Sequence, residues 1–240
     1  MAARDRIIFP LDVGDMEAAR MWVEKLGRHV GWFKVGLELF TAAGPEVVEL
    51  ITSSGFRCFL DLKFHDIPNT VAGAVRSAVS LKAEMMTVHI SGGSEMIRAA
   101  LRAAEEESRS RGLPRPKIIG VSVLTSLGRD DLPTLGIDRS LQDQVSGLVD
   151  LAVGQGIDGI VCSPADLPFV RARVREDTVV ITPGVRPQWS EAGDQKRIAT
   201  PREAIDAGAD LMVIGRPISK SPDPVEAVKR IIAEIESPAG

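Results

Sequence analysis

The sequence has few of the residues and patterns that mark metal, redox and membrane proteins. Its two cysteines, Cys58 and Cys162, lie in the apolar segments RCFLDL and IVCSP and form no CxxC pair, so buried free thiols are expected. No apolar stretch is long enough to span a membrane. The formal net charge is −4, from 29 Lys plus Arg against 33 Asp plus Glu. This charge argues against general attraction to nucleic acid or to an anionic membrane.

The chain otherwise has the composition of an ordinary soluble globular protein, with 240 residues, 44% hydrophobic and 26% charged. A domain of this size buries roughly 70 to 75% of its unfolded surface and needs no disulfide or structural metal. Because no linker-like shift in composition is visible, we expect one domain over residues 1–240. The opening residues MAARDRIIFPLD contain too short an apolar run for a signal peptide, so a cytoplasmic protein is expected.

Short runs rich in β-branched residues alternate with longer amphipathic stretches, which is the pattern of βαβ units and a parallel sheet. The predicted strands are residues 7–11, 32–35, 57–62, 85–89, 117–122, 159–162, 179–182 and 211–214. The predicted helices between them are residues 16–26, 45–53, 70–79, 95–108, 141–153 and 224–235. Eight units in 240 residues approach the ~250 residues of a typical (β/α)8 barrel. The expected fold class is therefore α/β, a closed (β/α)8 barrel.

Two connections are longer than a barrel needs, namely residues 124–138 and 183–199. Long loops in compact domains are usually lids or binding loops. Both loops follow predicted strands, so they should emerge at the carboxyl end of the barrel, where barrel enzymes carry their active sites.

The segment LDLKFHDIPNT, residues 60–70, carries three charged side chains near the end of the third predicted strand. Asp61 and Lys63 are two residues apart, so strand alternation would point both to one face. Burying an aspartate and a lysine is costly unless they are paired, which indicates either an internal salt bridge or an active site. Asp66 follows on the loop before Pro68, where it either adds a second acid to a site or caps the next helix.

Other polar residues stand where predicted strands end. Asp12 ends the first strand and Lys34 the second, and each alone is more often a helix cap or a solvated side chain. Charged residues that converge from three successive strands nevertheless favour a shared site. Thr125, just past the fifth strand, either adds a neutral hydrogen-bonding group or is an ordinary turn residue.

The last two strands end in features of a phosphate site. Strand eight ends in MVIGRPI, which contributes Gly215 and Arg216, and strand seven ends in ITPGVRP, which contributes Arg186 and is followed by Gln195. Loops after strands seven and eight form the recurrent phosphate site of this architecture. Arginine binds phosphate through two parallel donors, and glycine lets backbone N–H groups approach. The alternative is a pair of surface arginines beside turn prolines.

Several familiar motifs are absent. His65 and His89 show no HxH, HxxxH or HExxH spacing, so no metal site is expected and structural roles are favoured. By alternation His65 would point away from Asp61 and Lys63 if the strand continued that far. The P-loop and GxGxxG patterns are also missing, which argues against bound ATP or a Rossmann-type dinucleotide.

A set of segments along the chain resembles the orotidine 5'-phosphate decarboxylase family in its bacterial form. These segments are FPLD, FKVGLELF, LDLKFHDIPNT, VHISGG, VLTS, VCSP, TPGVRP, GDQKR and VIGRP, in the family's order and spacing. LDLKFHDIPNT is the most specific of them. The resemblance implies decarboxylation of orotidine 5'-monophosphate to UMP, with release of CO2 and without a cofactor. It further implies that this is the last step of de novo pyrimidine synthesis and that the enzyme is a barrel homodimer.

The resemblance also implies a role for each candidate residue. The expected catalytic residues are Lys63, which would protonate C6 of the pyrimidine, and the flanking Asp61 and Asp66. Residues 66–70, including Ile67 and Thr70, would enter the partner subunit's site. The remaining substrate contacts would be Asp12 and Lys34 to the ribose, Thr125 to the pyrimidine, and Arg186, Gln195, Gly215 and Arg216 to the phosphate and the closing lid.

Two other interpretations fit parts of the pattern. A magnesium-dependent sugar-phosphate decarboxylase on the same barrel, such as a keto-gulonate phosphate decarboxylase, shares an Asp-x-Lys-x-x-Asp segment. A non-catalytic barrel that binds phosphorylated metabolites would need the basic loops but would leave Asp61, Lys63 and Asp66 without a purpose.

Overall fold

The protein folds as a closed parallel barrel in the computed structural model, which describes residues 1–190 and 199–237. Within these residues eight strands pair in chain order, and β8 pairs back with β1. The strands are β1 (Ile7–Pro10), β2 (Trp32–Gly36), β3 (Arg57–Phe64), β4 (Met85–His89), β5 (Lys117–Val121), β6 (Gly159–Val161), β7 (Val179–Pro183) and β8 (Leu211–Val213). Each lies within one or two residues of the predicted run, so the expected (β/α)8 fold is confirmed.

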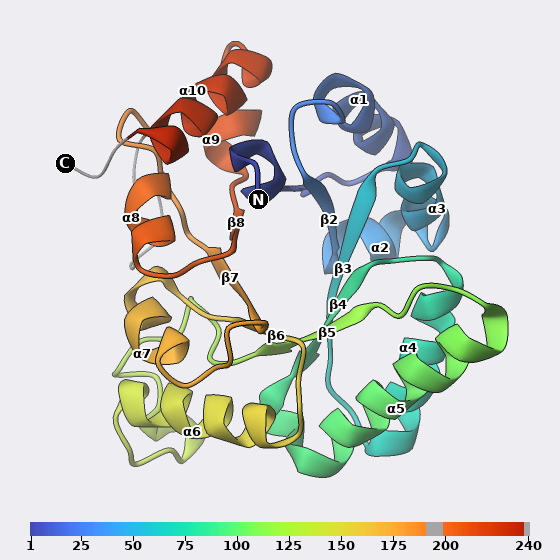
Figure 1. Ribbon diagram of the computed structural model, residues 1–240, viewed down its shortest axis with the longest axis vertical. Helices are drawn as coiled ribbons and strands as arrows, with labels where there is room; N and C mark the ends of the chain where they lie inside the picture. The colour runs from blue at the N-terminus through green and yellow to red at the C-terminus, as the bar shows by residue number, and fades with distance from the viewer. Residues whose placement is uncertain (191–198, 238–240) are drawn as a thin grey trace.

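Helices surround the ring of strands (Figure 1). Periodicity predicted α1 (Met16–Leu26), α3 (Glu46–Ser53), α4 (Pro68–Ser80), α5 (Gly93–Arg111), α6 (Leu141–Gly154) and α10 (Pro224–Glu236). It missed α2 (Leu37–Ala43), α7 (Leu167–Arg171), α8 (Pro201–Asp206) and α9 (Arg216–Ser219). These four helices have at most 7 residues, too few to show a helical period. The 3₁₀ turns are η1 (Ala3–Arg6), η2 (Ile90–Gly92), η3 (Pro133–Leu135) and η4 (Pro164–Asp166).

Side-chain caps fix where several helices begin. The Asp15 carboxylate accepts a hydrogen bond from Ala18 N at 2.8 Å at the start of α1. At the start of α8, Thr200 and Glu203 form a capping box. Such caps satisfy backbone N–H groups that have no partner within the helix, and they define where each preceding loop ends.

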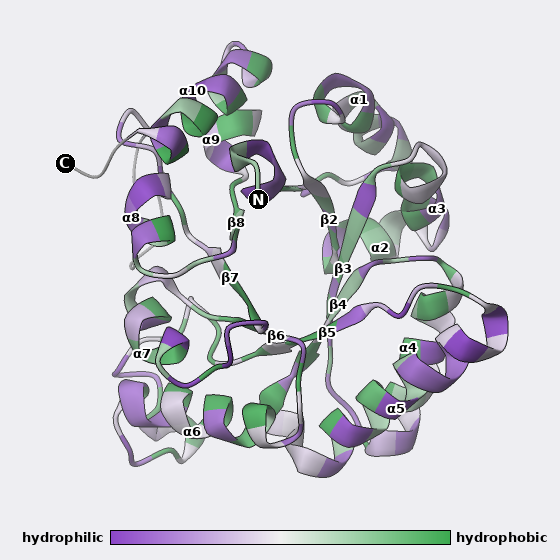
Figure 2. Cartoon of the chain, viewed as in Figure 1, coloured by the Kyte–Doolittle hydropathy of each residue, from purple (hydrophilic) through white to green (hydrophobic). Residues whose placement is uncertain are grey.

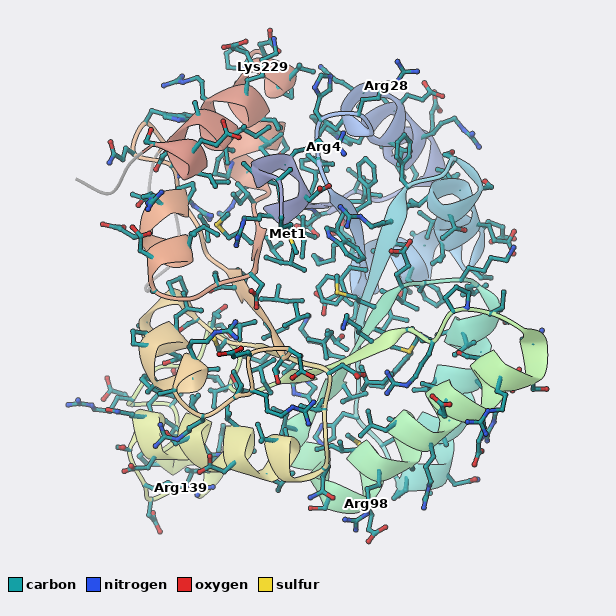
Figure 3. All side chains as sticks on the ribbon, viewed as in Figure 1. Met1, Arg4, Arg28, Arg98, Arg139 and Lys229 are labelled. Carbon is teal, nitrogen blue, oxygen red and sulfur yellow. The ribbon has the colours of Figure 1, made fainter. Side chains whose placement is uncertain are left out.

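The core has two parts, one between strands and helices and one inside the barrel. Figure 2 shows predominantly hydrophobic strands, and Figure 3 shows side chains filling the ring, with the labelled Arg28, Arg98, Arg139 and Lys229 at its periphery. The inner cluster consists of Ile8, Phe59, Met85, Ile119, Ile181 and Leu211, each at most 2% exposed. Alternate strands of a barrel supply such layers. This inner cluster borders the cavity that is described in the next subsection.

Both cysteines are buried thiols outside any disulfide, as the sequence predicted. Burial raises the pKa of the Cys58 thiol, with the nearby Glu84 carboxylate adding to the effect. Among the described residues, no helix combines the length and apolar character needed to cross a membrane.

Candidate active site

A cavity of about 180 Å³ opens at the carboxyl ends of the barrel strands. Phe59, Val161 and Val213 line its walls and also belong to, or pack against, the inner core cluster. Leu124 and Thr125 come from the loop after β5, so this loop borders the site as expected. The charged side chains that line the cavity are Lys34, Asp61 and Lys63. Apolar walls around a few charges are typical of a small-molecule site.

Four charged side chains, from β2, β3 and the loop just after β1, form a row of alternating sign. Lys63 Nζ lies 2.9 Å from both Asp61 Oδ1 and Asp61 Oδ2. Lys34 Nζ lies 3.5 Å from Asp61 Oδ2 and 3.4 Å from Asp12 Oδ1. Gly36 leaves room for this ammonium, because a Cβ there would lie 2.9 Å from Lys34 Nζ. The structure therefore brings together Asp12, Lys34, Asp61 and Lys63, as the strand ends predicted.

The centre of the row is the Asp61 carboxylate, whose residue is only 8% exposed. Burial alone would raise its pKa, but the charges of Lys34 and Lys63 and the hydrogen bonds from Lys63 and Thr87 outweigh burial. The net effect is a pKa below the usual aspartate value, and the carboxylate is ionised at neutral pH. Asp61 therefore fixes the position of both ammonium groups.

Lys63 reaches Asp61 by a route that strand alternation did not predict. Leu60 pairs with Met86 and Phe64 with Val88, so three residues of β3 face Thr87 alone on β4. This bulge includes Lys63, whose φ of 52° lies in the left-handed region, at a cost of about 1 to 3 kcal/mol for a residue other than glycine. Bulges beside active sites re-aim side chains. Alternation was thus the wrong reason for a correct pairing.

Thr87 is a site residue that the sequence analysis missed. It is fully buried, its Oγ1 accepts a hydrogen bond from Lys63 N at 2.8 Å, and its hydroxyl donates to Asp61 Oδ1 at 3.0 Å. A threonine inside MMTVH is ordinary for a strand, so only the pairing of β3 with β4 reveals its contacts.

Asp66, Ile67 and Thr70 lie apart from the row. All residues of the 65–70 segment are exposed, Ile67 by 68%. Asp66 Oδ1 accepts a hydrogen bond from Ile67 N at 2.6 Å, and within the described part of the chain Asp66 forms no ion pair. Since the cap residue of α4 is Ile67 and makes no side-chain cap bond, the alternative in which Asp66 caps that helix is not observed. Within the described residues of one chain, this segment therefore adds no hydrogen bond or ion pair to the row formed by Asp12, Lys34, Asp61 and Lys63.

The basic residues predicted for phosphate border a second cavity of about 400 Å³. Arg186 is buried and its Nη1 donates to Val185 O at 2.9 Å, while Arg216 begins α9. Gly215, two residues after β8, lets the chain pass close to Pro10 of β1, since a Cβ there would lie 2.8 Å from Pro10 Cγ. Gln195 lies outside the described residues. Trp189, Lys220 and Arg230, which the sequence analysis did not single out, also line this cavity.

The two histidines, His65 and His89, lie near Lys63, whose charge acts on His89. Their ring centroids are 5.2 Å apart. The strand β3 ends at Phe64, so the condition under which His65 would point away, a strand that continues to it, is not met. Burial lowers the pKa of His89, with the charges of His65 and Lys63 adding to it and Asp61 opposing. Across residues 1–190 and 199–237, no three His, Cys, Asp or Glu side chains are grouped as for a metal ion.

Comparison with known proteins identifies the family. The chain matches the model described as "Orotidine 5'-phosphate decarboxylase / HUMPS family" over residues 5–231. The chain belongs to this family. It is 49% identical over 237 residues to the orotidine 5'-phosphate decarboxylase of Moorella thermoacetica, covering 98% of this chain and 94% of that protein. The corresponding Paramagnetospirillum magneticum protein is 48% identical over 225 residues, covering 94% and 96%.

Solved structures agree with this assignment. The crystal structure of orotidine 5'-phosphate decarboxylase from Lactobacillus acidophilus has a TM-score of 0.86 to this fold at 35% identity, covering 96% of this chain and 99% of that one. The family, the fold and the enzyme class expected from the sequence are confirmed, and the protein is a carboxy-lyase. The interpretation as a non-catalytic binding barrel is therefore wrong.

Proposed function

We propose that this enzyme converts orotidine 5'-monophosphate to UMP and CO2 without a cofactor, as the last step of de novo pyrimidine synthesis in the cytoplasm. Relatives at 44 to 49% identity over nearly the whole chain carry the name of that activity. The observation that carries the proposal is the position of Lys63, whose ammonium lies 2.9 Å from both oxygens of buried Asp61 at the wall of the cavity.

Lys63 is the proposed proton donor. When the bond from C6 to the carboxylate breaks, CO2 leaves and the electron pair stays on C6, and the ammonium then gives its proton to that carbon. A fixed cation stabilises the negative charge as it develops, before the proton moves. Two unit charges ~4 Å apart interact by about 4 kcal/mol at an effective dielectric of 20, and enzymes lower barriers by up to ~23 kcal/mol. One charge therefore supplies only part of the effect.

The rest of the acceleration has to come from binding energy at the non-reacting end of the substrate. Arg186, Arg216 and the Gly215 backbone are the proposed phosphate ligands, with Gln195 as a fourth. Binding energy from a distant group can hold the reacting end in an otherwise unfavourable position and drive loop closure. The two arginines line one cavity, which supports their acting on one anion.

The ribose and the pyrimidine ring of the substrate are assigned to other residues that line or border the Lys63 cavity. We assign the ribose hydroxyls to Asp12 and Lys34, since their side chains meet at 3.4 Å beside Asp61. Thr125 lines the cavity next to Leu124, and we assign the contact with the pyrimidine ring to its hydroxyl.

A homodimer is part of the proposal, with residues 66–70 of one subunit completing the site of the other. The exposure of this segment supports it, because Ile67 is 68% exposed and Asp66 forms no ion pair among the residues that the structure describes. Mixing inactive Lys63→Ala and Asp66→Asn variants tests the sharing. In a two-fold dimer with shared sites, about a quarter of the sites in a random 1:1 mixture are intact. A mixture as inactive as its components would exclude a shared site.

The activity itself is tested by adding orotidine 5'-monophosphate to protein purified in EDTA and following the fall in ultraviolet absorbance. We expect full turnover with EDTA present and no gain on adding magnesium. Loss of activity in EDTA with rescue by magnesium would instead favour the magnesium-dependent alternative, to be checked with a keto-gulonate phosphate. No absorbance change under either condition would overturn the proposed function.

A further inference from the structure

The bulge in β3 changes the hydrogen bonding between β3 and β4. Asp61, Leu62 and Lys63 all stand opposite the single residue Thr87 of β4. A regular parallel ladder would bond these backbones residue by residue, but three residues against one leave backbone groups without ladder partners. The Lys63 N–H is one of these groups, and it donates to the Thr87 side chain at 2.8 Å. A side chain thus takes the place of a strand hydrogen bond.

The same hydroxyl also sets the orientation of the carboxylate. Thr87 Oγ1 accepts from Lys63 N and donates its own proton to Asp61 Oδ1 at 3.0 Å. A hydroxyl has one proton to donate, so these two contacts define its direction. Thr87 is completely buried, where a lost hydrogen bond is costly. One atom therefore links the backbone of Lys63 to the carboxylate that holds the Lys63 ammonium.

The backbone of Lys63 is strained, so its conformation depends on the hydrogen bond to Thr87. A lysine with φ of 52° is held against a preference of about 1 to 3 kcal/mol, so its conformation persists only while its surroundings enforce it. If the hydroxyl is removed, the backbone of Lys63 loses a bond that favours the bulge, and Asp61 loses a donor. Both changes displace the ammonium from the 2.9 Å geometry.

We infer that Thr87 is a positioning residue for decarboxylation, acting through its hydroxyl on Lys63 and Asp61. This inference rests on the roles proposed for those two residues. Supporting hydrogen bonds hold reacting groups within about 0.5 Å of their productive geometry, and a misplacement of about 1 Å can lower the rate about 100-fold. Substrate binding, which also involves the phosphate end, should therefore be affected less than kcat.

The test compares Thr87→Val, which keeps the shape but loses the hydroxyl, with Thr87→Ser, which keeps the hydroxyl. We expect kcat of Thr87→Val to fall about 10- to 100-fold while KM and the Kd for UMP change by less than about threefold. Thr87→Ser should recover kcat to within about threefold of wild type. The matched control is Thr182→Val, because Thr182 is equally buried on β7 and donates to the Cys162 carbonyl instead, at 2.9 Å.

A second readout separates positioning from general destabilisation. The Thr87 hydrogen bond is one of the influences that lower the pKa of Asp61, so its loss should raise that pKa. The acid limb of the kcat profile should then move to higher pH in Thr87→Val and stay in place in Thr87→Ser and Thr182→Val. If Thr87→Val does not fold, Thr87→Cys keeps the volume with only a weak donor and takes its place with the same expectations.

Lys63→Ala, measured in parallel, tells the two possible failures apart. If Lys63→Ala keeps its activity, the proposed function of Lys63 is wrong. If Lys63→Ala is inactive but the hydroxyl-free Thr87 variant matches Thr182→Val in kcat and in its acid limb, the inference about Thr87 is overturned and the mechanism stands.

Discussion

The two ends of the site are built in different ways. At the reacting end, Asp61 and Lys63 come from one strand and are held by contacts of 2.9 Å, with Thr87 at 3.0 Å or less from both residues. At the proposed phosphate end, Arg186 lies beyond β7 and Arg216 on a helix of 4 residues, around a cavity of about 400 Å³. The first arrangement lines a cavity of about 180 Å³ and the second a cavity of about 400 Å³, so the first is called the narrow end and the second the wide end.

This difference fits the two chemical tasks proposed above. Proton transfer to carbon requires the donor to be placed within tenths of an ångström, which strands and buried hydrogen bonds provide. Anion binding tolerates a looser geometry, because charge attraction falls slowly with distance and arginine offers five donors. We therefore expect damage at the reacting end to act on kcat, and damage at the phosphate end to act on kcat/KM with a smaller total effect.

The largest effect is expected for Lys63→Ala. Loss of the proposed proton donor and of its charge should lower kcat by about a thousandfold or more, with the Kd for UMP within about threefold of wild type. Lys63→Arg sharpens the result, since arginine keeps the charge but does not give up its proton, and it should remain nearly as inactive. Steady-state kinetics and calorimetry with UMP measure both quantities. An active Lys63→Arg enzyme would show that charge alone suffices.

A smaller effect is expected for Arg216→Ala at the other end. Removing one proposed charged phosphate ligand should lower kcat/KM about 10- to 100-fold. Lys220→Ala is the control, because Lys220 lines the same cavity one helical turn further on and has no assigned phosphate contact. A change in Arg216→Ala of less than about threefold, under ~1 kcal/mol, would contradict the idea that this end supplies binding energy for catalysis.

Acid sensitivity of folding is the third expectation, and it concerns the narrow end alone. Burial opposes ionisation of Asp61, but its lysine partners and hydrogen bonds prevail and its pKa is lowered. A lowered pKa gives stability that is present above the unfolded value of about 3.9 and is lost as the pH falls through the folded value.

Urea unfolding at a series of pH values from 6 to 3 measures this contribution. The stability difference between wild type and Asp61→Asn should shrink as the pH falls below about 4. Asp12→Asn serves as the control, since the Asp12 side chain is 64% exposed. A difference between wild type and Asp61→Asn that stays constant over the whole series would contradict the lowered pKa.

The contrast between the two ends of the site also explains how much of the structure the sequence alone predicted. The barrel followed from eight apolar runs at regular spacing, and Asp12 and Lys34 were found because strand ends converge at one mouth of a barrel. Contacts made within that frame were not predictable. The β3 bulge depends on its pairing with β4, and no local pattern distinguishes a bulged residue from a regular one. Thr87 was therefore overlooked.

At the phosphate end the missing information was of another kind. Arg186 and Arg216 were predicted from the known position of phosphate loops, yet Trp189 and Arg230 were not. Arg230 is 44 residues along the chain from Arg186 and belongs to α10, so only the closure of the barrel brings it into the same cavity. Contacts between the last helix and an earlier loop leave no trace in local periodicity.

The smallest effect is expected for the contact between Arg230 and Trp189. The Arg230 guanidinium lies 4.3 Å from the centroid of the Trp189 ring, three residues beyond Arg186 on the same segment. A cation–π contact at an exposed site contributes about 0.5 to 1 kcal/mol, so Arg230→Ala should raise KM about two- to fivefold and leave kcat within about twofold. Lys229→Ala, the exposed neighbour paired with Glu226 at 3.3 Å, should change neither. If Arg230→Ala instead lowered kcat at constant KM, the wide end would share the strict geometry of the narrow one.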